Sequence, residues 1–164
     1  STIAAASEAI AKKSHTTMFK RDAKGLYIES RTVKSMLKEC VAILFPGGKG
    51  KDAHKWGVTK KGPRSATAEW VFVNPDHILL GVTEPTGVDL SITHVTGPTG
   101  RRSSLSYYEY VERAVVTFDV MVAKDTVKPE QWSMIWVHAE ENGLGAKRSQ
   151  SFGRFNVTEW QAVK

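Results

Sequence analysis

The chain has 164 residues, of which 41% are hydrophobic and 24% charged, and its formal net charge at pH 7 is +6. This length allows one domain with a proper core, whereas two independent domains would each be small. No apolar run approaches the roughly 18 residues of a membrane-spanning helix, so we expect no contact with a membrane.

A single cysteine, Cys40, excludes an intramolecular disulfide. The first residues lack the charged-then-apolar pattern of a signal peptide. We therefore expect a protein of the reducing cytoplasm.

The N-terminal half predicts a strand followed by a helix. Residues 1–24 are an N-terminal extension in which "IAAASEAIAKK" (3–13) has helix-favouring composition, and "TTMFKRDAKGLYI" (16–28) fits a hairpin. "GLYIES" (25–30) is typical of a short strand, and Ser30 is a suitable cap for the helix "RTVKSMLKECVAILF" (31–45). The apolar stripe of this helix consists of Val33, Leu37, Cys40, Val41 and Leu44, whereas Arg31, Lys34 and Lys38 lie on another face.

Residues 45–65 form a basic loop rich in glycine and lysine, which we interpret as an insertion. Beyond it, "TAEWVFV" (67–73) and "VDLSITHV" (88–95) predict further strands. We expect "GPTGRRSS" (97–104) to be a surface loop with two turn-forming glycines.

The C-terminal half predicts strand, helix, glycine-rich loop and strand. "AVVTFDVMVA" (114–123) alternates as a strand does. Pro129 suits the first helical position, and the apolar residues Trp132, Ile135, Trp136 and Ala139 follow at helical spacing. Asn142 and Gly143 then favour the end of the helix, and "RFNVTEW" (154–160) predicts the last strand.

The order strand, helix, strand occurs in both halves and is the order of a split βαβ fold. The fold class we predict is α+β, with residues 1–164 forming a single ferredoxin-like, or RRM-like, domain that has long basic loops.

The positive charge gathers in three glycine-containing segments. Six basic residues against Asp52 give residues 45–65 a net charge of +5, residues 97–104 add two arginines, and residues 143–154 add three basic residues. The rest of the chain is therefore net negative. Such loops favour a polyanion, because glycine lets the backbone approach phosphates while Lys and Arg replace counterions.

The spacing Gly143-Leu144-Gly145, five residues, Ser151-Phe152-Gly153 resembles the glycine-rich loop of the RAMP superfamily of CRISPR-associated RNA-binding proteins. "LYIESRTVKSMLKE" (26–39) is similar to another recurrent stretch of that family, a strand that runs into a basic helix. Serine at Ser151 departs from the family's glycine. The resemblance implies a ferredoxin-like domain that binds RNA and works as a repeated subunit in a ribonucleoprotein.

The residues of the glycine-rich loop favour anion binding independently of that resemblance. Its glycines allow backbone N–H groups to face a phosphate, while Leu144 and Phe152 are expected to turn inward as anchors. A tight connection whose glycines solve only a steric problem is the alternative. The residues we predict to contact nucleic acid in and near the loop are Gly143, Gly145, Lys147, Arg148, Gly153, Arg154, Arg31 and Lys34.

The other two basic segments extend this prediction. In residues 45–65 an aromatic that can stack on a base, Trp56, lies among cations that can hold phosphates. The residues predicted to bind nucleic acid there are Lys49, Lys51, Lys55, Trp56, Lys60, Lys61 and Arg64, and Arg101 and Arg102 are predicted from residues 97–104.

The sequence indicates no cofactor, no metal and no assigned catalytic residue. The five histidines are scattered without the spacing of a zinc site, and no phosphate-binding Gly-x-x-x-x-Gly-Lys-Ser/Thr motif occurs. His54, in the basic loop, is the one candidate base for cleaving RNA without metal.

The function we predict is binding of single-stranded RNA, or single-stranded DNA, through backbone phosphates. The partners expected with it are further copies of the chain or other subunits of a ribonucleoprotein. A metal-independent endoribonuclease is one alternative. A protein-interaction module of a mobile element, which joins or blocks such a complex, is the other.

Overall fold

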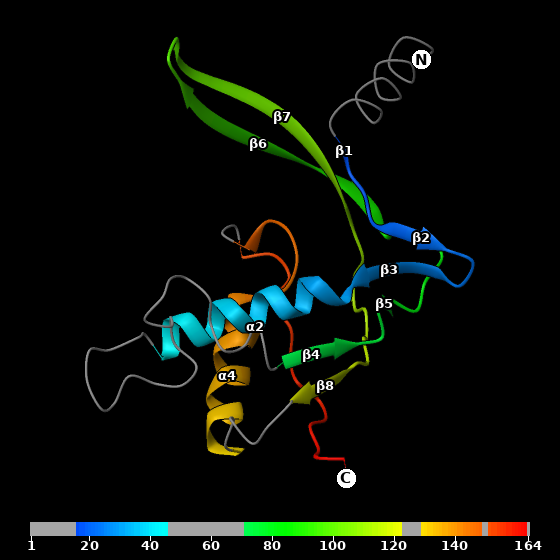
Figure 1. Ribbon diagram of the computed structural model, residues 1–164. Helices are drawn as coiled ribbons and strands as arrows, with labels where there is room; N and C mark the ends of the chain where they lie inside the picture. The colour runs from blue at the N-terminus through cyan, green and yellow to red at the C-terminus, as the bar shows by residue number, and fades with distance from the viewer. Residues whose placement is uncertain (1–15, 46–70, 123–128, 149–150, 164) are drawn as a thin grey trace. The chain divides into compact units, whose positions relative to one another are not determined.

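The computed structural model describes residues 16–45, 71–122, 129–148 and 151–163. These residues form three small, mostly antiparallel sheets and two helices, so the predicted α+β class is confirmed (Figure 1). The elements follow in the order β1 (Thr16–Thr17), β2 (Lys20–Asp22), β3 (Gly25–Glu29), α2 (Ser30–Leu44), β4 (Val71–Asn74), β5 (His77–Leu79), β6 (Gly87–Gly97), β7 (Gly100–Tyr110), β8 (Asp119–Val122) and α4 (Pro129–Asn142). Neither described helix is long and apolar enough to cross a membrane.

The chain divides into two compact units. Unit 1 is drawn from Ser1–Ile28 and Ile78–Thr117, and unit 2 from Glu29–His77 and Phe118–Lys164. Unit 1 contains a three-stranded sheet in the order β2-β3-β5 and another in the order β1-β7-β6. Unit 2 contains both described helices and the β4–β8 pair.

The predicted hairpin at the end of the N-terminal extension is confirmed. β2 and β3 pair antiparallel, with Asp22 opposite Gly25. The turn needs glycine at Gly25, because its φ is +125° and a Cβ there would lie 2.6 Å from the carbonyl oxygen of Val82. Leu26 follows and is fully buried. The hairpin thus places the first core residue of β3.

A long antiparallel hairpin, β6–β7, dominates the rest of unit 1 (Figure 1). Its ladder runs from the pair Gly87 and Tyr110 to the pair Gly97 and Gly100, so the turn is only the short link between those last two glycines. The interpretation of 97–104 as a surface loop was therefore wrong for its second half, which begins β7. Periodicity did not reveal that strand, because its tip lacks apolar residues that alternate.

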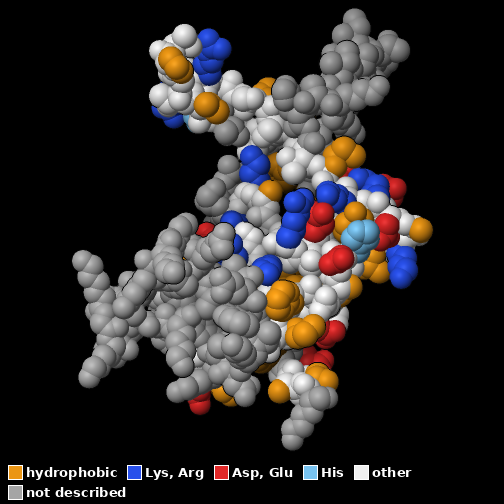
Figure 2. Space-filling view, viewed as in Figure 1, with side chains coloured by type: hydrophobic (Ala, Val, Ile, Leu, Met, Phe, Trp, Pro, Cys, Tyr) orange, Lys and Arg blue, Asp and Glu red, His pale blue; other side chains and the backbone are white. Residues whose placement is uncertain are grey.

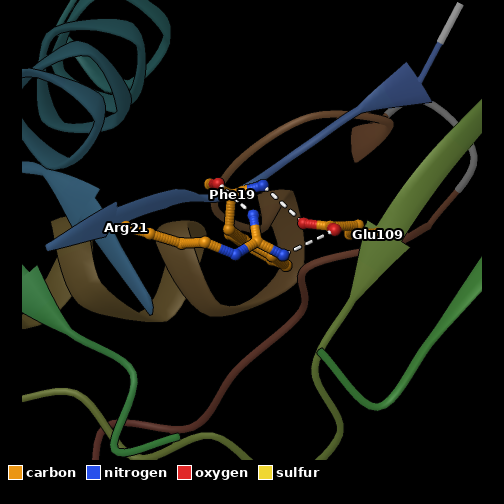
Figure 3. A network of polar contacts seen from close by, with 3 residues as sticks. All are labelled: Phe19, Arg21 and Glu109. Atoms are coloured by element: carbon orange, nitrogen blue, oxygen red, sulfur yellow. Dashed lines mark hydrogen bonds and ion pairs between the residues drawn. The ribbon is translucent and has the colours of Figure 1, made fainter. Parts of the chain in front are cut away.

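A buried carboxylate ties the N-terminal segment to this hairpin (Figure 3). Glu109 on β7 accepts a hydrogen bond from the backbone N–H of Phe19, at 2.9 Å, and another from Nη2 of Arg21, at 2.8 Å. The hydrogen bond with Glu109 raises the pKa of the Arg21 guanidinium above its ordinary value. Both carboxylate oxygens therefore have a donor, which a side chain only 7% exposed requires.

In unit 2 the predicted helix 31–45 is confirmed as α2. Its apolar stripe is buried at Val33, Leu37, Cys40 and Val41 and packs against α4 and β4. The capping prediction was wrong: Glu29 precedes the helix without a side-chain cap, and Ser30 is the first helical residue. The backbone N–H of Ser30 donates instead to the carbonyl oxygen of Asp76, at 2.9 Å, so a tertiary contact replaces the cap.

The second predicted helix is confirmed as α4, and its four predicted apolar residues, Trp132, Ile135, Trp136 and Ala139, are buried. The predicted strand 154–160 was wrong, because residues 154–163 have no regular secondary structure. The backbone N–H of Val157 donates to Oε1 of Glu140, at 2.6 Å, and the ring of Trp160 packs 5.1 Å from that of Trp136. Side chains of α4 thus hold this segment.

The strand predictions for unit 2 are confirmed in part. β4 covers Val71–Asn74 and pairs antiparallel with β8, Asp119–Val122. The predicted strand 114–123 is therefore too long at its N-terminal end, where residues 114–118 form no strand.

Candidate nucleic-acid interface

The glycine-rich loop follows α4 directly. The backbone N–H of Gly143 donates to the carbonyl oxygen of Ala139 at 2.8 Å, and a φ of +84° turns the chain out of the helix there. Asn142 and Gly143 thus end the helix as predicted.

The two ends of the loop lie against each other at Gly143 and Gly153. The backbone N–H of Leu144 donates to the carbonyl oxygen of Gly153 at 2.9 Å. A Cβ on Gly153 would overlap the carbonyl oxygen of Leu144, and one on Gly143 would lie 2.9 Å from that of Phe152. Gly143 and Gly153 are therefore needed for steric reasons, as the alternative interpretation of the loop predicts.

Gly145 differs from the other two glycines. Its φ is +97°, but no atom outside its immediate neighbours lies within 4 Å of a Cβ built there. The backbone conformation requires glycine at this position, and the absence of a side chain leaves open space beside the main chain. Of the predicted glycines, it is the one at which a ligand could approach the backbone closely.

Among the described residues of the loop, Lys147 and Ser151 adopt left-handed conformations although they are not glycines, with φ of 64° and 66°. Such residues cost free energy that the surrounding structure must supply, and they gather at functional sites. The anchoring prediction was wrong for Phe152, whose side chain is 43% exposed, whereas Leu144 is half-buried. The hydrogen bond from the backbone N–H of Leu144 to the carbonyl oxygen of Gly153 closes the loop without that anchor.

An ion pair between Arg148 and Glu39 joins the loop to α2. The two residues are 109 positions apart in the sequence, and their side chains are 30% and 44% exposed. A pair exposed to this extent contributes little to stability, so its main effect is to position the loop beside the helix. Sequence reasoning missed Glu39, because no local pattern indicates a partner so distant.

Two further predicted contacts, Arg31 and Lys34, lie on α2. At 100° per residue, Arg31, Ser35 and Lys38 form one line along the helix, which we call the α2 stripe, and all three are exposed. Arg31 also pairs with Glu29 at 2.6 Å. Glu39 and Lys34 project on opposite sides of the stripe, Glu39 toward its partner in the glycine-rich loop. The structure thus brings the loop and the basic helix together.

Of the three other predicted contacts among the described residues, Arg154 belongs to unit 2, and Arg101 and Arg102 belong to unit 1. Arg154 is exposed and only 3.8 Å from Glu141, and it does not begin a strand. Arg101 and Arg102 lie at the tip of the β6–β7 hairpin in unit 1, on opposite faces of β7, and Arg102 donates to Oγ1 of Thr99 at 3.0 Å.

The residues predicted to act in the basic insertion fall outside the described residues. They are Lys49, Lys51, Lys55, Trp56, Lys60, Lys61, Arg64 and the candidate base His54. They stay predictions.

The described residues of the loop and of α2 offer positive charge and backbone donors. Burial raises the pKa of the Cys40 thiol to about 11, so this fully buried cysteine stays protonated at neutral pH. Within residues 16–45, 71–122, 129–148 and 151–163, no three His, Cys, Asp or Glu side chains gather where they could hold a metal ion. Binding of an anion is what this arrangement can do chemically.

Comparison with protein-family models found no family that matches the chain, and comparison with curated proteins found no similar protein.

Proposed function

We propose that the chain binds single-stranded RNA through its phosphate backbone, as a non-catalytic subunit of a CRISPR-type ribonucleoprotein or of an assembly that forms along the RNA. The observation that carries the proposal is the Arg148–Glu39 ion pair, which holds the glycine-rich loop beside α2. Cations of both elements, Lys147 and Arg148 with Arg31 and Lys38, can then contact successive phosphates of one strand.

The proposal includes a ferredoxin-like fold. β3, α2, β4, β8 and α4 follow in the order of the first five elements of such a domain, with β5 to β7 between β4 and β8. β3, however, pairs in the β2-β3-β5 sheet and not with β4 or β8. The antiparallel pairing of β4 with β8 supports this assignment. A reducing cytoplasm suits the unpaired, buried Cys40.

The test is binding of a fluorescent mixed-sequence RNA at several salt concentrations, with Lys147→Ala/Arg148→Ala compared with the unchanged protein. Each phosphate contact on a single strand contributes about 0.7 to the slope of log K against log salt, so the variant should lose about 1.4. Its affinity should fall alike for all RNA sequences.

The matched control is Lys20→Ala/Lys24→Ala, which removes the same charge from the β2–β3 hairpin of unit 1. This variant should keep the original slope. An equal loss in both variants would mean that only net charge matters, and an unchanged slope in Lys147→Ala/Arg148→Ala would remove the loop from the interface. RNA recovered in pieces would favour the endoribonuclease instead.

A further inference from the structure

The two-stranded sheet of unit 2 has one covered face and one exposed face. Val71 and Val73 are buried where α2 packs against β4. Because side chains alternate along a strand, Phe72 belongs to the other face, opposite Met121 in the register. The two side chains are 43% and 56% exposed. Figure 2 shows hydrophobic side chains at the surface around β4 and β8, with Lys and Arg beside them.

This face combines stacking and hydrogen-bonding groups. Next to the pair of Phe72 and Met121 lies the pair of Asn74 and Asp119, both exposed. An aromatic ring on an open sheet face is a surface on which unpaired bases stack. Amide and carboxylate groups beside such a ring can bond to the edge of a base.

A cation connects this face with α2. Nζ of Lys34 lies 4.9 Å from the centroid of the Phe72 ring, a cation–π distance. A positive charge over one face of the ring suits the phosphate of a nucleotide stacked on the other face and disfavours a basic or purely apolar partner. The pair of Phe72 and Met121 by itself does not identify a ligand. The charge of Lys34 indicates a ligand with a phosphate group.

The helix gives this face continuity with the glycine-rich loop. Lys34 and Glu39 project on opposite sides of the α2 stripe, Lys34 toward Phe72 and Glu39 toward Arg148. Five residues of helix separate them, a rise of about 7.5 Å. Loop, stripe and sheet face thus follow one another across unit 2.

We infer that the exposed face of the β4–β8 pair, centred on Phe72 and Met121, is a platform that binds an unpaired base of the RNA whose phosphates contact α2 and the loop. The inference rests on the proposed function and extends it from the backbone to the bases. Phe72 stacks on the base, Lys34 holds the adjoining phosphate, and Asn74 and Asp119 bond to the base edge.

The experiment compares an oligouridine RNA with an abasic oligomer of the same ribose-phosphate backbone. The unchanged protein should bind the RNA more tightly than the abasic oligomer. Phe72→Leu removes the ring but keeps an apolar side chain, and it should weaken RNA binding roughly 5- to 150-fold, the range for loss of one stacked base. Its affinity for the abasic oligomer should equal that of the unchanged protein.

Two variants control for folding and for loss of apolar surface. Phe72→Tyr retains an aromatic ring and should bind RNA within about twofold of the unchanged protein. Met134→Ala removes another exposed apolar side chain, on α4, and should leave RNA binding unchanged. Thermal melting of each variant checks that the fold is intact, and quenching of a 2-aminopurine base in the oligomer reports stacking directly.

The outcomes distinguish failure of this inference from failure of the proposed function. Equal affinity of the unchanged protein for RNA and abasic oligomer would overturn the platform and leave the backbone interface standing. RNA binding that is the same in Phe72→Leu would also overturn it. If the protein bound neither oligomer at low salt, the proposed function itself would fail.

Discussion

At the residue scale, two glycines of the glycine-rich loop are required for different reasons. Gly153 needs both a φ of +77° and the absence of a Cβ, whereas Gly145 needs only its φ of +97°. We expect Gly145→Ala to lower the free energy of unfolding by about 1–2 kcal/mol, the cost of a left-handed alanine. Gly153→Ala should lower it by more, on the order of 3 kcal/mol, because Leu144 must also move. Urea unfolding measures both, and equal losses would contradict the close approach at Gly153.

Cys40 provides a prediction about pH at the same scale. Its thiol has a pKa of about 11 in the folded chain against 9.0 unperturbed, chiefly because burial disfavours the thiolate. Above about pH 9 the unfolded chain loses this proton while the folded chain keeps it, so stability falls as pH rises toward 11 and is unaffected below that window. Urea unfolding between pH 8 and 10.5 should show a steeper fall for the unchanged protein than for Cys40→Ala. An equal fall of stability with pH in the two proteins would contradict the raised pKa of Cys40.

At the element scale, Glu109 fastens the segment between β1 and β2 to the β6–β7 hairpin. Glu109→Gln keeps the shape but leaves one acceptor for two donors, so we expect a loss of about 1–2 kcal/mol in unfolding free energy. Amide exchange at Phe19 should accelerate with it, because that N–H loses a charged partner.

The matched control for this prediction is Glu141→Gln. Glu141 is exposed and 3.8 Å from Arg154, so the same change there should cost less than about 0.5 kcal/mol. A comparable loss in the two variants would show that Glu109 does not hold the segment.

At the scale of the whole molecule, the sequence predicts RNA contacts at Arg101 and Arg102 in unit 1, besides those that we propose in unit 2. Arg101→Ala/Arg102→Ala in unit 1 and Lys147→Ala/Arg148→Ala in unit 2 should each lower the salt slope by about 1.4. The quadruple variant should lower it by about 2.8, because contacts that share no partner add. A quadruple variant with the slope of either double variant would confine the interface to one unit.

The sequence by itself determined the local elements of this protein. α2, α4, the β2–β3 hairpin and the turn at Gly143 follow from helical periodicity, alternation and the residues that tolerate positive φ, which are properties of neighbouring residues. The glycine-rich loop was recognised by its spacing for the same reason. The sequence did not determine how this loop is anchored, because the exposure of Phe152 depends on which contacts close the loop.

Only the tertiary structure decided which distant residues meet. Glu39 and Arg148 pair across 109 positions, Lys34 lies over Phe72, and the segment at Val157 bonds to Glu140 where alternation predicted a strand. Each of these contacts depends on how helices and strands pack, and no periodicity encodes that packing. An exposed phenylalanine and a buried one have the same pattern in a short strand, so the candidate platform became visible only when β4 paired with β8 and α2 covered one face.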